Sequence, residues 1–178
     1  MQLITQGTEL LDWDSVDILR KDLLLAWDKG RKVFLCGNGG SAANANHLAN
    51  DLLYGISPIE GKGLDVHSLA SNTSVITCLA NDTGYEHIFS KQLASLAAKQ
   101  DMLIALSGSG NSANILNAII QAKKLGLKTH SIVGFDGGKC REISDNCIHL
   151  PIEDMQVSED FQMIVGHVLM KYLSAVKA

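Results

Sequence analysis

Two pairs of histidine and carboxylate residues have the types and spacing for metal or proton chemistry. His47 and Asp51 are four residues apart, so in a helix they share one face. Glu159 and His167 are eight residues apart, about 80° around a helix, so both can lean toward one point. Neutral imidazoles and carboxylates are ligands for zinc. The sequence leaves open whether the pairs meet, because a solvated helical pair and a buried core histidine are the ordinary alternatives.

Two turns rich in glycine and serine have the composition of a phosphate site. Gly37–Ser41 follows the apolar run Val33–Cys36 and precedes an alanine-rich segment, 41–54, which predicts a helix with Ser41 near its N-cap. Ser107–Ser112 offers three hydroxyls between another expected strand and helix. Backbone N–H groups at such turns and at helix N-termini bind phosphate without a metal or a basic side chain. The alternative is an ordinary turn between strand and helix.

Two motifs of nucleotide-binding proteins are incomplete in this sequence. Gly37–Ala42 fits the G-x-G-x-x-A pattern of dinucleotide-binding proteins, but the end of the second expected strand, Ala70–Asn72, has no acidic residue for a ribose. Gly138 and Lys139 are followed by Cys140, so no hydroxyl is placed for the magnesium of a P-loop. The sequence therefore argues against nicotinamide, flavin and P-loop enzymes.

The elements that must position these residues alternate between strand and helix. Apolar runs predict strands at 32–36, 64–70, 102–106, 129–133 and 147–150. Helical spacing and capping residues predict helices at 15–28, 41–54, 72–79, 85–99, 113–125 and 157–176, with a loop at 55–63 and a turn at 81–84. The pattern predicts one α/β domain over 1–178, flavodoxin-like, with a five-stranded parallel sheet and helices on both faces. Ligands in such folds bind at the carboxyl ends of the strands.

Composition narrows the class of protein. The chain has 178 residues, 46% of them hydrophobic, and a net charge of −4 without a basic block, which argues against nucleic acid as a partner. The four cysteines form no Cys-x-x-Cys pair, so we expect reduced thiols used as small apolar residues. We find no signal peptide and no apolar run of membrane-spanning length, and we therefore expect a soluble cytoplasmic protein without a membrane partner.

Three motifs in this order resemble one known family. They are Cys-Gly-Asn-Gly-Gly-Ser-Ala-Ala-x-Ala-x-His (36–47), Asn-Asp-x-Gly-Tyr-Glu (81–86) and Ser-x-Ser-Gly-Asn-Ser (107–112). The chain resembles the bacterial sedoheptulose-7-phosphate isomerases, also called phosphoheptose isomerases, of the sugar isomerase (SIS) domain superfamily. The resemblance implies a five-stranded parallel sheet, a sugar phosphate substrate, a homotetramer with sites between subunits, and one zinc ion per site.

The resemblance also implies roles for particular residues. Zinc would be bound by His47, Asp51, Glu159 and His167, and Asp51 and His167 would move protons between C1 and C2 of an open-chain ketose phosphate through an enediol. Substrate or phosphate contacts are implied at Asn38, Gly39, Gly40, Ser41, Asn72, Asn81, Asp82, Ser107, Ser109 and Ser112. The helix at about 15–29 would take part in oligomerisation, and its apolar face could pair with a copy through Val16, Leu19, Leu23, Leu24 and Trp27.

Four positions depart from the family pattern. Asp51 replaces Glu, Glu159 replaces Gln, Gly55 replaces a substrate-contacting Arg, and Asn72 replaces an Asp. An Asp carboxylate is one methylene shorter than that of Glu, about 1.5 Å, and a misplacement of about 1 Å can cost on the order of a hundredfold in rate. Metal and phosphate binding are therefore better supported than efficient turnover of the family's usual substrate.

Two functions remain at this point. The first is an aldose–ketose isomerase acting on a phosphosugar. The second is a non-catalytic sugar-phosphate-binding or scaffold protein, resembling the branch of the family that binds the replication initiator. Retention of His167 favours the enzyme, whereas the glycine at position 55 favours a binder or a changed substrate.

Overall fold

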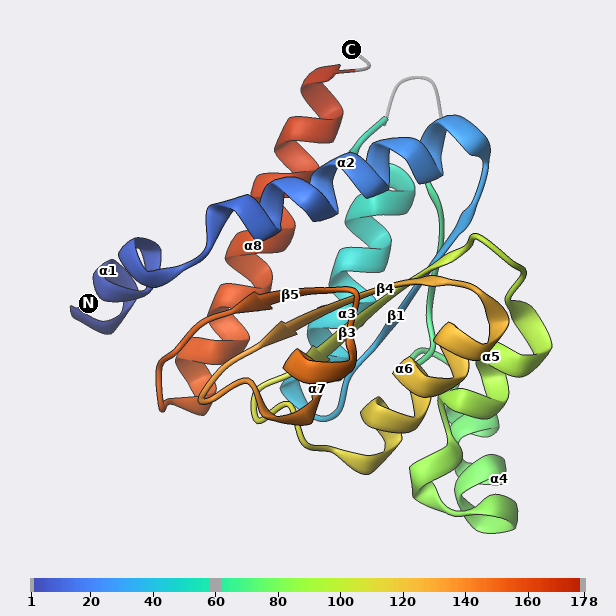
Figure 1. The fold of residues 1–178 in the computed structure, drawn as a ribbon. Coiled ribbons are helices and arrows are strands. Elements are labelled where there is room, and N and C mark those ends of the chain that lie inside the picture. The colour runs from blue at the N-terminus through green and yellow to red at the C-terminus, as the bar shows by residue number, and fades with distance from the viewer. Residues whose placement is uncertain (1, 58–61, 177–178) are drawn as a thin grey trace.

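The central feature of the computed structural model is a parallel sheet. The structure describes residues 2–57 and 62–176, and part of the predicted loop 55–63 lies outside them. Within these residues the sheet has five strands in the order β2-β1-β3-β4-β5, all parallel (Figure 1). The strands are β1 (Lys32–Cys36), β2 (Asp65–Ser68), β3 (Met102–Ser107), β4 (Lys128–Val133) and β5 (Asn146–His149). The predicted fold class is confirmed.

Helices cover both faces of the sheet because the apolar side chains of each strand alternate. Val33 and Leu35 of β1 point into one core, whereas Phe34 and Cys36 point into the other. The first core is covered by α1 (Gln2–Leu10), α2 (Trp13–Lys29), α3 (Gly40–Asn50) and α8 (Met155–Val176) (Figure 1). The second is covered by α5 (Ser90–Leu96), α6 (Ala113–Leu125) and α7 (Gly138–Ile143), with α4 (Thr73–Thr83) beside them.

Several boundaries differ from the prediction. Helix α1 was not predicted, and its place depends on a tertiary contact, since a Cβ at Gly7 would overlap the ring of Phe161. The predicted turn 81–84 is wrong, because α4 continues to Thr83 and the chain changes direction only at Gly84, with φ of 96°. The predicted helix 85–99 is divided into a 3-10 turn, Tyr85–His87, and α5. The six residues of α7 are too few to give a recognisable apolar period.

The predicted oligomer face of α2 is mostly buried in its own chain. Val16, Leu19 and Leu23 are at most 4% exposed and belong to the core, with Leu24 and Trp27 packed partly against it. The apolar residues that α2 exposes are Trp13, Ile18 and Leu25. In the described part of the chain, no helix combines the length and apolar character needed to cross a bilayer. The cytoplasmic location stays a prediction.

Helices α3 and α8 approach each other closely at Gly166. A Cβ at Gly166 would overlap Cδ2 of Leu48, so the absence of a side chain lets α8 lie against the leucine of α3. Leu48 is 3% exposed and lies in the core cluster shared by the two helices. His47 and His167 are the neighbours of these two residues in the sequence. The contact therefore sets the distance between the helices that bear the two histidines.

We predict that Gly166→Ala lowers the free energy of unfolding by about 1–3 kcal/mol, because a methyl group overpacks this contact. Leu48→Ala alone should cost about 2–5 kcal/mol through the cavity it leaves. The double variant should lose less than the sum, since the shortened side chain makes room for the new methyl group. Urea unfolding of the three variants measures this coupling, and strictly additive losses would contradict the contact.

Candidate metal and phosphate site

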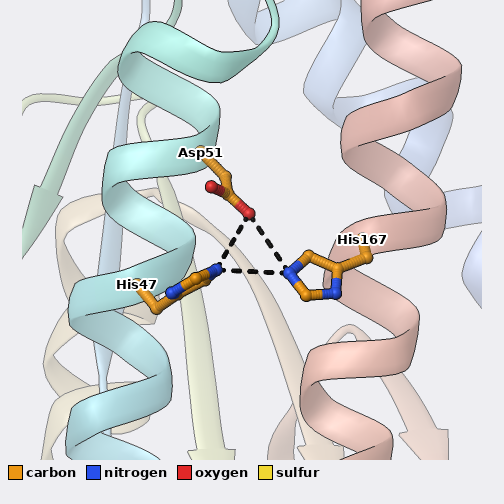
Figure 2. A group of neighbouring side chains, drawn as sticks. All are labelled: His47, Asp51 and His167. Carbon is orange, nitrogen blue, oxygen red and sulfur yellow. Dashed lines mark hydrogen bonds and ion pairs between the residues drawn. The ribbon is translucent and has the colours of Figure 1, made fainter.

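His47, Asp51 and His167 converge, although the two histidines are 120 positions apart. Figure 2 shows the three side chains pointing toward one another between α3 and α8. The Nε2 atoms of the histidines are 3.2 Å apart, and Oδ2 of Asp51 lies 3.3 Å from His47 Nε2 and 3.4 Å from His167 Nε2. The predicted meeting of these three residues is thus observed.

A short π-helix places the carboxylate of this group. The backbone changes from α-helix to π-helix at Asp51, where Ile56 N–H donates to Asp51 O at 3.0 Å, and the π-helix extends over Asp51–Gly55. Such insertions into α-helices are frequent at functional sites. Asp51 is 8% exposed as a residue, whereas the side chains of His47 and His167 are 52% and 49% exposed. The carboxylate therefore lies deep and the imidazoles lie at an open rim.

The spacing of the three donor atoms fits zinc. A tetrahedral zinc ion with ligand bonds of about 2.0–2.1 Å keeps its donors about 3.3–3.4 Å apart. The three observed separations, 3.2, 3.3 and 3.4 Å, lie within 0.2 Å of that edge length. Two imidazoles and one carboxylate form a common donor set for catalytic zinc, in which the fourth position stays open.

Glu159, the fourth predicted ligand, does not join this group within the residues that the structure describes. A Cβ at Gly40 would overlap the carboxylate of Glu159, so that carboxylate packs against the first turn of α3. The spacing of Glu159 and His167 brings them to similar angles around α8, but it also separates them along the helix axis. Eight residues along a helix correspond to about 12 Å, which separates Glu159 from His167 along the axis. The assignment of Glu159 to the metal group is therefore corrected.

The two predicted phosphate turns form one small pocket of about 110 Å³. It lies where β1 and β3 end side by side, the point at which the chain order of the sheet reverses. Ligands of open α/β sheets bind at this point. The pocket is lined by predicted residues, Asn38, Ser41, Ser107, Ser109 and Ser112, and by residues not predicted there, Leu106, Gly108, Met155 and Glu159. The residues predicted from both turns are thus brought together.

The serine hydroxyls are oriented by neighbouring donors. Ser107 Oγ accepts from Gly110 N–H at 3.1 Å, and Ser109 Oγ accepts from Asn111 N–H at 3.3 Å. Ser41 Oγ accepts from Gln162 Nε2 at 3.0 Å. A hydroxyl that accepts in this way keeps its hydrogen for another acceptor, such as a phosphate oxygen. Gly39, with φ of 55°, is the N-cap of α3, and Ser41 lies two residues after it, near the cap as predicted.

Polar residues that the sequence did not single out support the pocket. The amides of Asn38 and Asn114 bond reciprocally at 2.8 and 2.9 Å, and Tyr85 Oη donates to Asn38 Oδ1 at 3.0 Å. Gln162 is 1% exposed and accepts from Asn44 Nδ2 at 3.0 Å while it donates to Ser41. The sequence could have indicated Gln162, because it is a polar residue among the apolar residues on the buried face of α8.

Asn72, Asn81 and Asp82 do not line this pocket in the described part of the chain. Asn72 caps α4, its Oδ1 accepting from Val75 N–H at 3.2 Å. Asn81 Nδ2 donates to Asp82 Oδ1 at 2.8 Å, and Asp82 Oδ2 accepts from the thiol of Cys78 at 3.4 Å. Their predicted substrate contacts are therefore not supported by the geometry of this chain.

The cysteines near the pocket are unsuited to nucleophilic chemistry. All four cysteines belong to the described residues and are free thiols. Burial raises the pKa of the Cys36 thiol, which precedes the first turn, well above its usual range. Burial likewise raises the pKa of Cys140 to about 12, and the backbone N–H of that residue donates to Gly110 O. Both thiols stay protonated and act as small apolar residues, as predicted.

Comparison with known proteins assigns the chain to a family. The family model described as "SIS domain" matches residues 4–134, more than half of the chain. The chain therefore belongs to the SIS domain family. Phosphoheptose isomerase of Helicobacter pylori strain P12 is 44% identical over 138 residues, which cover 78% of this chain and 71% of that protein. The same enzyme of Aliarcobacter butzleri is 41% identical over 140 residues, 79% and 74% of the two chains. Within the SIS domain family, this chain belongs to the phosphoheptose isomerases.

Solved structures extend the likeness over almost the whole chain. Phosphoheptose isomerase from Neisseria gonorrhoeae superposes with a TM-score of 0.90 at 27% identity, covering 98% of this chain and 92% of that one. The enzyme from Francisella tularensis gives a TM-score of 0.91 at 26% identity with the same coverage. The predicted resemblance is confirmed. The alternative of a non-catalytic scaffold is not favoured, because these relatives carry the name of an enzyme.

Proposed function

We propose that the protein isomerises sedoheptulose 7-phosphate to D-glycero-D-manno-heptose 7-phosphate. The observation that carries this proposal is that α3 contributes to both parts of the site. Its first turn lines a phosphate-sized pocket, and His47 further along it belongs to a group suited to metal and proton chemistry. The chain also belongs to the phosphoheptose isomerase family. Ser41 and His47 are six residues apart on α3, a rise of about 9 Å. A ligand with its phosphate at one end and its reacting carbons at the other suits that separation.

Asp51 and His167 are the groups that move protons. The carboxylate of Asp51 takes the proton from C1 of the ketose, and the Nδ1–H of His167 gives a proton to the carbonyl oxygen at C2, which yields the enediol. Asp51 then delivers its proton to C2, and His167 takes the proton from the oxygen on C1, which leaves the aldehyde. Both groups end as they began. The low exposure of Asp51 limits competition from water for its carboxylate.

A zinc ion fits the donor atoms of His47, Asp51 and His167. When bound there it would polarise the carbonyl and enediol oxygens of the substrate. Oδ2 of Asp51 faces both histidines, whereas Oδ1 contacts only Asn50 Nδ2, at 3.4 Å, among the described residues. Oδ1 is therefore the oxygen of Asp51 available for proton transfer.

We expect the protein, purified without chelator, to bind one zinc ion per chain. His47→Ala should lower the affinity for zinc at least about tenfold, because one of three protein ligands is lost. Glu159→Gln should leave zinc content unchanged, since that carboxylate packs against Gly40. His67→Ala, a histidine outside the group, is the matched control. Metal analysis after dialysis measures all four proteins, and a wild-type protein that takes up no zinc at neutral pH would defeat the assignment.

We expect the zinc-loaded protein to convert sedoheptulose 7-phosphate to an aldose phosphate. Asp51→Asn should lower kcat about 10²- to 10⁴-fold, because the amide cannot accept the proton. Ser109→Ala combined with Ser112→Ala should instead raise KM, with about 1 kcal/mol lost for each neutral hydrogen bond. Product analysis should include shorter ketose phosphates, given the departures at Asp51 and Gly55. Absence of any aldose product, with zinc bound, would refute the proposal.

We further propose a homotetramer. Apolar side chains remain exposed on the outer sides of two long helices, at Ile18 and Leu25 of α2 and at Val168 and Tyr172 of α8. Each is at least 40% exposed, and exposed apolar side chains of this kind are what associating chains bury.

Light scattering at micromolar concentration should give about four times the chain mass of 19.1 kDa. Ile18→Lys combined with Leu25→Lys should reduce that mass, because two charges would be buried in the contact. Lys124→Glu is the control for a charge change, because Lys124 is exposed on α6 and lies outside both helices of the proposed contact. A wild-type mass of one chain would exclude the tetramer.

A further inference from the structure

Glu159 places a negative charge in a pocket that is otherwise suited to an anion. Its side chain lines the phosphate pocket together with the four serines, and its carboxylate packs on Gly40 at the start of α3. The described lining residues include no lysine, arginine or histidine that could neutralise it. A bound phosphate would therefore lie near an uncompensated carboxylate.

The carboxylate also lacks a donor. Across residues 2–57 and 62–176, no hydrogen bond or ion pair reaches the Glu159 carboxylate oxygens, although the residue is partly buried. The carboxylate oxygens are not among the buried unpartnered atoms of the described residues, so they are free to accept a hydrogen bond from a ligand in the pocket. The pocket thus offers four hydroxyl donors for phosphate oxygens and one acceptor for a different part of the ligand.

The position of Glu159 is fixed by its neighbours. Asn44 Nδ2 donates to the backbone oxygen of Glu159 at 3.0 Å and to Gln162 Oε1 at 3.0 Å. Gln162 in turn donates to Ser41, so this turn of α8 is tied to the first turns of α3. Because Gly40 has no Cβ, the carboxylate lies directly on the helix backbone. The positive end of α3 stabilises it there, which leaves the Ser107–Ser112 turn for the phosphate.

We propose that Glu159 determines specificity in this pocket: its carboxylate accepts a hydrogen bond from a hydroxyl of the sugar chain and disfavours dianions that bring no donor. A sugar phosphate recovers the electrostatic cost through that hydrogen bond, whereas a sulfate ion has no hydrogen to donate. The inference rests on the proposed function, since it assigns the phosphate end of the substrate to this pocket.

The test compares sulfate with sedoheptulose 7-phosphate by calorimetric titration of the zinc-loaded protein at one ionic strength. Glu159→Gln should bind sulfate about tenfold more tightly than the wild type, because one negative charge leaves the pocket. The sugar phosphate should gain less, since it loses a charge-assisted hydrogen bond. The preference for sugar phosphate over sulfate should therefore fall at least about fivefold.

Asp160→Asn is the matched control, because it removes the same charge from the neighbouring exposed residue, which does not line the described pocket. It should change either affinity less than about twofold. Equal zinc content and equal urea midpoints of wild type and Glu159→Gln exclude a metal or folding effect.

An unchanged preference in Glu159→Gln, or an equal change in Asp160→Asn, overturns the inference while the proposed function stands. If sulfate binding tightens but no sugar phosphate binds to either protein, the charge effect of Glu159 stands and the proposed substrate fails. If the wild-type protein and Glu159→Gln bind neither ligand, both the pocket assignment and the inference fail.

Discussion

The contact between α3 and α8 is the constraint on which the rest of the site depends. The sheet orders the strand ends, but His47 and His167 of the candidate metal group lie on helices, and the distance between these helices is set where Leu48 packs on Gly166. One turn toward the amino end of α8, the buried amide of Gln162 links Asn44 to Ser41. An apolar contact and a polar network thus fix the same pair of helices. Protein interiors are close-packed, so small changes at such a contact are transmitted to the atoms beside it.

The two parts of the candidate site are built from different kinds of structure. The phosphate pocket is built from backbone turns and short hydroxyl side chains that directly follow β1 and β3. The His47, Asp51 and His167 group lies further along the helices, with its imidazoles at an open rim. Anchoring the unreactive end of a ligand on the rigid part lets binding energy orient the reactive end. The same arrangement leaves the rim free for a partner chain or for substrate to approach.

Local signals in the sequence were sufficient for much of this arrangement. Apolar runs identified every strand to within two residues at each end, and the i,i+4 spacing of His47 and Asp51 gave a shared face. The predictions failed where the outcome depends on how residues are arranged in three dimensions. Glu159 has a suitable angle around α8 but lies about 12 Å along the axis from His167. The apolar face of α2 was assigned to a copy of the chain, whereas Leu19 and Leu23 are needed by its own core. The π-helix at Asp51 and the amide pair of Asn38 and Asn114 have no local signature at all.

The position of Glu159 shows how a change of one residue can be absorbed by the fold. The resemblance to the family implies a neutral amide there, and a carboxylate in an anion pocket would be repelled by the ligand and strongly desolvated. Gly40 removes the steric obstacle, and the helix terminus supplies partial positive charge, so the carboxylate rests at α3 without a basic partner in the described chain. The cost is that α3 can no longer offer its full dipole to a phosphate. With the proposed function, the Ser107–Ser112 turn and the N-terminus of α6 would then provide most of the anion binding, on the β3 side of the pocket.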